Sequence, residues 1–135
     1  MEKKNQDIFN TFLVKAEKRL EAKKVQRTCL VKLPSFGEVV RLRGLSASEV
    51  AETMDADTST DSFAGDRYSV YLSMVEPDLK ELAKKLKEEG KITEYLEVTE
   101  IFEIYEIRQM AEQIMELSGI TSKNKVEVVA EQLKN

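Results

Sequence analysis

Residues 104–119 constrain the fold of this chain most, because their side chains separate into an apolar and a polar arc when placed on an α-helix. The apolar arc consists of Ile104, Ile107, Met110, Ala111, Ile114 and Leu117. The polar arc consists of Glu106, Arg108, Gln109, Glu112, Gln113 and Glu116. The apolar arc is broad enough to face a core, and Gly119 can end the helix in the left-handed conformation. We therefore predict an amphipathic helix packed on a core.

Three apolar side chains near the start of this helix, Ile101, Phe102 and Tyr105, do not lie on the apolar arc. One interpretation is structural: the helix begins near Glu103 after a break, and the aromatic rings close the core over residues 91–100. The other interpretation is a second apolar face that binds a partner protein. Ile101, Phe102 and Tyr105 are therefore the first candidate partner-binding residues, followed by the basic first helix and the C-terminal tail.

The charge is distributed unevenly along the 135 residues, a length that suits one domain. Residues 1–32 carry nine basic and four acidic side chains, a net of +5, whereas residues 94–118 carry seven glutamates against Arg108, a net of −6. The whole chain has a net charge of −4 and a pI near 5.1, so no nucleic-acid partner is expected. The two oppositely charged segments can attract one another or serve different partners.

Composition argues against an enzyme. The chain has no histidine, which excludes zinc sites, Ser-His-Asp triads and Cys-His pairs. The five glycines are isolated, so no phosphate-binding loop is expected, and neither a cofactor nor a metal is predicted. The single cysteine, Cys29, fits a reducing cytoplasm, and no apolar run has the length of a membrane span or the pattern of a signal peptide.

The remaining patterns predict a mostly helical α+β fold in one domain, residues 1–135, with about five or six helices and a small two-stranded antiparallel β element. A first helix over 1–24 places Ile8, Phe9, Phe12, Leu13, Ala16 and Leu20 on one arc. Alternating residues around a Pro-Ser-Phe-Gly turn predict a β-hairpin over 25–45. A helical body follows over 46–119, in which Ser46 and Glu49 form a capping box and a later helix includes Val75 and stops before Pro77. Residues 120–135 are either a tail or a short helix.

The acidic loop at 55–66 has partial EF-hand spacing, with Asp55, Asp57, Ser59 and Asp61 at alternate positions. The loop lacks the glycine of the sixth position, where Thr60 stands, and the glutamate of the twelfth, where Asp66 stands. We therefore expect a solvated acidic loop whose acids cap helices, with Asp66 capping the next one, rather than a calcium site.

Several short motifs, in this order and spacing, resemble the tail assembly chaperones of contractile-tailed bacteriophages, in the XkdN-like branch found in defective and temperate prophages of Gram-positive bacteria. They are VRLR at 40–43, VEPDL at 75–79, the Glu103-Ile104 start of the last helix and its IMELSG end at 114–119. The resemblance covers roughly residues 30–120, and the basic first helix and the insertion-like segment 91–100 depart from the pattern.

The resemblance implies a non-enzymatic protein that binds the long, helical tape-measure protein before the tail tube polymerises around it. The tail tube protein is a further candidate partner, and a homo-oligomer is compatible with this role. Such a chaperone is expected in the cytoplasm of the bacterial host and not in the finished virion. The alternative is a cytoplasmic bacterial regulator or adaptor that acts through protein–protein contacts, or less readily through nucleic acid.

Overall fold

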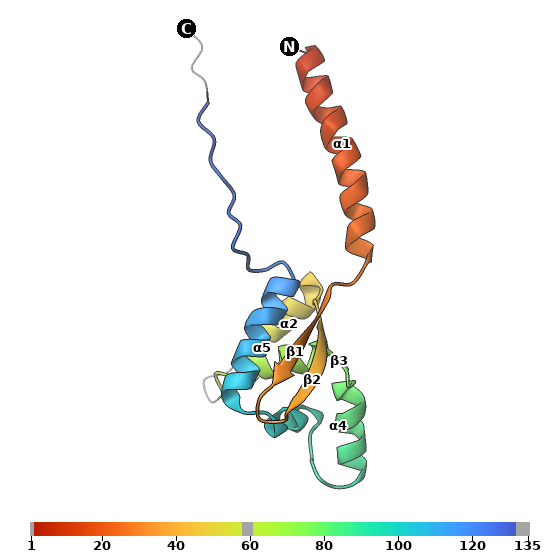
Figure 1. The fold of residues 1–135 in the computed structure, drawn as a ribbon, viewed down its shortest axis with the longest axis vertical. Coiled ribbons are helices and arrows are strands. Elements are labelled where there is room, and N and C mark those ends of the chain that lie inside the picture. Colours follow the sequence, from red (N-terminus) through yellow and green to blue (C-terminus); the bar gives the residue numbers. More distant parts are fainter. Residues whose placement is uncertain (1, 58–60, 132–135) are drawn as a thin grey trace.

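The computed structural model describes residues 2–57 and 61–131, which form a helical body around a small sheet and one long helix that projects from it (Figure 1). The elements are α1 (Glu2–Lys24), β1 (Thr28–Leu33), β2 (Glu38–Arg43), α2 (Ala47–Ala56), α3 (Ala64–Ser73), β3 (Met74–Glu76), α4 (Leu79–Glu88), the 3₁₀-helix η1 (Tyr95–Ile101) and α5 (Ile104–Leu117). The predicted class, α+β and mostly helical, is confirmed.

The hairpin forms as predicted, with Thr28 opposite Arg43 and Leu33 opposite Glu38. The prediction of only two strands is wrong, because β3 pairs antiparallel with the far edge of β2 and makes a sheet of order β1-β2-β3. The helix expected to include Val75 ends instead at Ser73. The Ser73 hydroxyl donates to the Arg43 carbonyl at 2.6 Å and accepts from the Arg43 amide at 3.1 Å, so it joins the end of α3 to β2.

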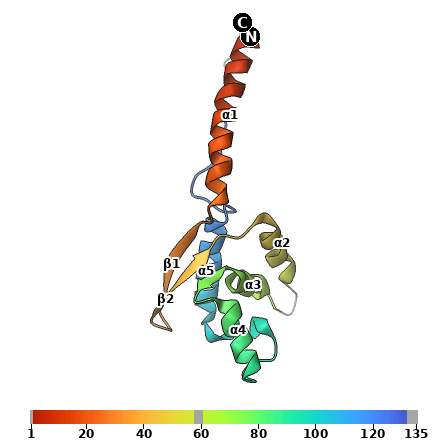
Figure 2. The same cartoon turned by 90° about the vertical axis from the view of Figure 1, so that its right-hand side faces the viewer.

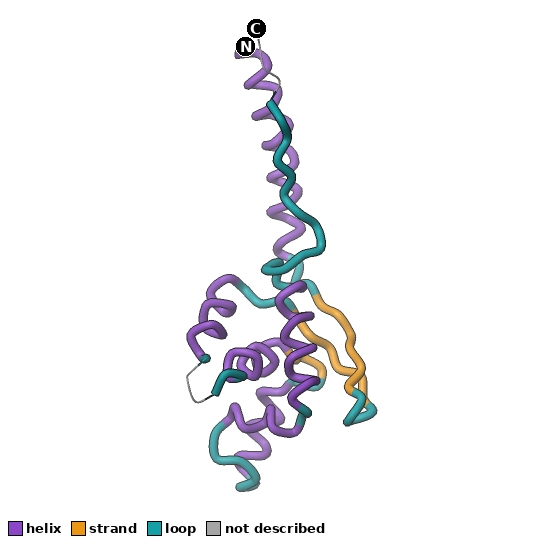
Figure 3. The backbone as a smooth tube through the Cα atoms, turned by 90° about the vertical axis from the view of Figure 1, so that its left-hand side faces the viewer, coloured by secondary structure: helices purple, strands orange, loops and turns teal. Residues whose placement is uncertain are grey.

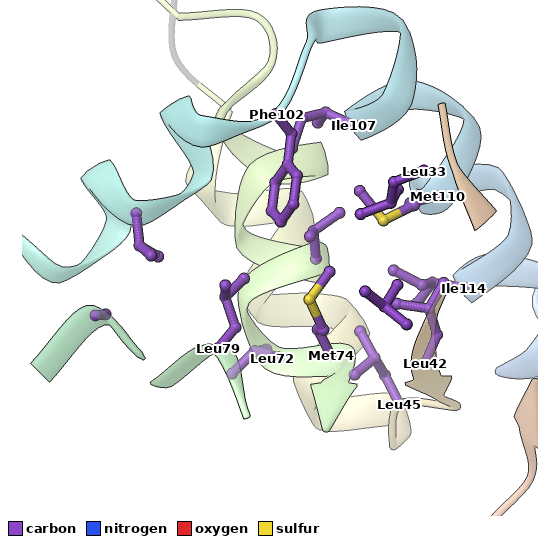
Figure 4. Packing of buried hydrophobic residues seen from close by; sticks show 14 of the residues in the cluster. Leu33, Leu42, Leu45, Leu72, Met74, Leu79, Phe102, Ile107, Met110 and Ile114 are labelled. Carbon is purple, nitrogen blue, oxygen red and sulfur yellow. The ribbon is translucent and has the colours of Figure 1, made fainter. Parts of the chain in front are cut away.

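The core lies where α5 crosses between the sheet and α3 (Figures 2 and 3). Its largest fully buried side chains include Leu42, Met74, Leu79 and Ile114, which converge from four different elements (Figure 4). Burial of large apolar side chains contributes roughly 1.5–3 kcal/mol each, so this cluster dominates the stability of the body.

The α5 helix has the predicted period, and Gly119 has a φ of +78° just beyond its end. Two positions differ from the prediction. Ile104, assigned to the core-facing arc, is 51% exposed, and Glu106, assigned to the solvent, is 2% exposed. The reason is the hairpin turn, which packs on the first turn of α5: Ser35 donates to Glu106 through its amide at 3.0 Å and its hydroxyl at 2.5 Å.

The predicted capping box at the start of α2 is present, since the Glu49 amide donates to the Ser46 hydroxyl at 3.2 Å and the Ser46 amide to the Glu49 carboxylate at 2.9 Å. Glu49 also pairs with Arg43 at 2.6 Å, a contact that the sequence pattern did not indicate. The hydrogen bond from Arg43 is the main reason that the pKa of Glu49 falls from its ordinary value of 4.5 to about 2.

This lowered pKa predicts an acid-dependent loss of stability. A carboxylate with a depressed folded-state pKa stabilises the protein above pH 4.5, and that contribution disappears as the pH falls towards 2. In a half-buried pair we expect about 1–2 kcal/mol after solvent screening. Denaturant unfolding of wild type and Glu49→Gln should therefore differ at neutral pH and converge near pH 2. A difference that persists unchanged at low pH would contradict the assignment.

Candidate partner-binding surfaces

A continuous exposed apolar surface lies on α1, whose described side chains, residues 4–24, are all exposed. We call its apolar face the α1 stripe, which consists of Ile8, Phe9, Phe12, Leu13, Ala16 and Leu20. Phe9 is 64% exposed and Phe12 is 72% exposed. The periodicity of this helix was correctly predicted, but no part of the described body covers its apolar face (Figure 1). The sequence signal for this surface was present and was the same as that of a core-facing helix.

The three candidate residues near α5 separate into two environments. Phe102 is in the core, 8% exposed, with its ring centroid 5.7 Å from that of Phe36 (Figure 4). Its assignment to a partner-binding surface is therefore corrected: the chain breaks between η1 and α5 and turns this side chain inward. Ile101 and Tyr105 are at the surface, 36% and 47% exposed, and their role in partner binding stays a prediction.

An apolar hollow of about 250 Å³ lies beside the hairpin turn. Phe36, Val39 and Ile101 form part of its wall, and buried residues such as Leu33 and Phe102 also line it. The hollow thus brings together two of the three predicted residues, the exposed Ile101 and the buried Phe102, with two hairpin residues, Phe36 and Val39, that the sequence pattern did not indicate. In the sequence, Phe36 belonged to a predicted turn and Val39 to a predicted strand. No sequence pattern therefore indicated that they form a shared surface with Ile101.

The segment after α5 has neither helix nor strand over residues 122–131, and it extends away from the body in the same general direction as α1 but apart from it (Figure 1). Val126, Val128 and Val129 are between 80% and 100% exposed. Of the two predicted alternatives, the described residues have the form of a tail, whereas residues 132–135 lie outside the described part of the chain.

The acidic loop before α3 uses its carboxylates to hold backbone and side-chain donors. Asp57 accepts from the Gly65 amide at 2.6 Å, and Asp61 accepts from the Phe63 amide at 3.0 Å and pairs with Arg67 at 3.2 Å. The predicted cap, Asp66, is wrong, since Phe63 occupies the N-cap position and Asp66 lies inside the first turn of α3.

Within residues 2–57 and 61–131, no group of three or more His, Cys, Asp or Glu side chains could hold a metal ion. Ser59 and Thr60, which belong to the proposed calcium spacing, lie outside the described residues.

Cys29, in β1, is the one nucleophilic thiol of the chain. Burial raises its pKa, against a smaller lowering by Arg41, and a raised pKa disfavours the reactive thiolate.

Comparisons with protein families, with curated proteins and with solved structures found no match. Among the described residues, no helix combines the length and the apolar character needed to span a bilayer.

Proposed function

We propose that this chain is a non-enzymatic tail assembly chaperone of a phage or prophage, which binds the tape-measure protein before the tail tube polymerises. The observation that carries the proposal is the α1 stripe. Its Phe9 and Phe12 are more than half exposed, and a continuous apolar face of this kind on an otherwise charged helix is typical of an interaction site.

The form of the stripe suits a helical partner. An amphipathic helix binds another by laying apolar side chains at i, i+3, i+4 and i+7 into a matching face. Ile8, Phe12 and Ala16 follow one another at the i+4 spacing, with Phe9 and Leu13 in the neighbouring row. A tape-measure protein, being long, apolar and largely helical, would offer such a face before tube assembly covers it.

Co-expression tests this proposal. The tape-measure protein is the one encoded beside this chain. More of it should stay in the supernatant of the cell lysate when this chain is co-expressed, and the two proteins should co-purify. Phe12→Asp should abolish the effect because it places a charge in the centre of the stripe. Val14→Asp is the matched control, since Val14 is also exposed, at 52%, but points away from the stripe on the same helix.

Two results would contradict the proposal. A tape-measure protein whose recovery does not depend on this chain would favour the alternative, a regulator or adaptor that uses the same stripe for another protein. If Phe12→Asp and Val14→Asp lowered the recovery of the tape-measure protein equally, the stripe would not be its binding site.

A further inference from the structure

We infer that the α1 stripe docks an amphipathic helix of another protein whose flanking side chains are acidic, an inference that rests on the proposed function and specifies its partner chemistry. Successive helical residues are rotated by about 100°. Lys15 and Arg19 therefore lie within about 20° of Ile8, at one edge of the stripe. Lys4 extends this edge towards the N-terminus. We call these three side chains, Lys4, Lys15 and Arg19, the basic edge.

The acids of α1 lie away from this edge. Asp7 is opposite the centre of the stripe, and Glu17 and Glu21 are on the far side of Leu13. Lys24 pairs with Glu21 at 3.0 Å, whereas no residue of the basic edge forms an ion pair in the described part of the chain. The positive charges of the basic edge thus border the exposed apolar face and are not paired with acids of the described chain. A partner helix with acidic side chains beside its own apolar face would complement them.

A second α1 complements the stripe less well. In a two-fold antiparallel pair, equivalent edges face each other, so Lys15 and Arg19 would meet basic side chains of the second copy. A parallel pair would instead bring two bodies together at one end. Residues 33–135 carry twelve basic and twenty-one acidic side chains, a net of −9, so the bodies would repel one another.

An anionic bilayer is also a poorer partner. A basic amphipathic helix can lie on such a surface, but the acidic body attached to α1 would be repelled by it. The polar side of α1 itself carries Asp7, Glu17 and Glu21, which would weaken the attraction further. The acidic body and the acids of α1 therefore disfavour an extended anionic surface more than a single acidic helix, which would contact only the stripe and the basic edge.

Fluorescence anisotropy with the full-length chain tests the inference. The probe is a labelled helical peptide with leucines on one face and glutamates beside them, and its twin has lysines in place of the glutamates. The acidic peptide should bind about tenfold tighter than its twin at about 50 mM salt, and the two should approach parity at about 500 mM. Phe12→Asp should abolish binding of the acidic peptide.

A matched pair of charge reversals locates the contact. Arg19→Glu should weaken binding of the acidic peptide about fivefold, because it removes one attraction and adds one repulsion. Lys18→Glu makes the same change of charge on the back of α1 and should weaken binding about twofold at most. Both positions are exposed, so both variants should retain the wild-type melting temperature.

Equal affinity for the two peptides, or equal effects of Arg19→Glu and Lys18→Glu, would overturn the inference. So would self-association of the chain in sedimentation equilibrium that Phe12→Asp abolishes, or binding to phosphatidylglycerol vesicles without binding to the acidic peptide. Peptide binding without tape-measure rescue would leave the inference standing and refute the proposed function. If the chain kept the tape-measure protein in solution but did not bind the acidic peptide, the proposed function would stand and this inference would be refuted.

Discussion

Phe102→Ala is expected to lower the free energy of unfolding by about 3–5 kcal/mol, through lost burial and the cavity that remains. The Phe102 side chain is 8% exposed, and its ring lies 5.7 Å from that of Phe36 at the junction of the hairpin turn and η1. Urea unfolding of both proteins, monitored by circular dichroism, provides the measurement.

Tyr105→Ala is the control for this prediction. It removes an aromatic ring three residues further on, but Tyr105 is 47% exposed, so the loss should stay within about 1 kcal/mol. If Phe102→Ala also cost less than about 1 kcal/mol, Phe102 would not be a core residue, and the partner-binding interpretation of this side chain would return.

Glu106→Ala is expected to lower the free energy of unfolding by about 1–3 kcal/mol, because it leaves three partly buried donors without an acceptor. The Glu106 carboxylate accepts from the Ser35 amide at 3.0 Å, the Ser35 hydroxyl at 2.5 Å and the Glu103 amide at 3.0 Å. No other contact joins the hairpin turn to the start of α5 through a buried charge in the described residues. Thermal unfolding of Glu106→Ala provides the measurement. Glu116→Ala, which changes an exposed glutamate of the same helix, is the control.

The pH dependence of this difference provides a second check. Burial alone would raise the pKa of Glu106, but the hydrogen bonds from Ser35 and Glu103 outweigh it and lower the pKa below 4.5. The ionised form is therefore the stabilising one, and its contribution is present above pH 4.5 and lost as the pH falls below it. A Glu106→Ala deficit that grew on acidification would contradict this account.

Elements specified by local chemistry were predictable from the sequence. The apolar period of α5, the glycine at its end, the alternating hairpin and the Ser46–Glu49 capping box each depend on residues a few positions apart. Backbone conformation and nearest-neighbour contacts decide such features, so a window of about ten to fifteen residues contains most of the information.

The candidate site was only partly predictable, because a local window of residues does not show which surfaces other segments cover. An apolar arc on α1 was visible in the sequence, but the same pattern describes a helix packed on a core and a helix left free. Ile101 and Tyr105 lie at the surface, but the sequence pattern left both a core and a surface position open for them. Phe36 and Val39 join Ile101 only because the hairpin turn folds against η1.

The sequence by itself determined the hairpin strands, most of the α-helices, the capping box of α2 and the glycine that ends α5. Only the tertiary structure decided that Met74–Glu76 adds a third strand, that Glu106 is buried under Ser35, that Phe102 turns inward and that the face of α1 stays open. The first three of these outcomes depend on contacts between segments more than thirty residues apart in the chain. Their contact follows from how the core closes, which no local pattern of residues encodes.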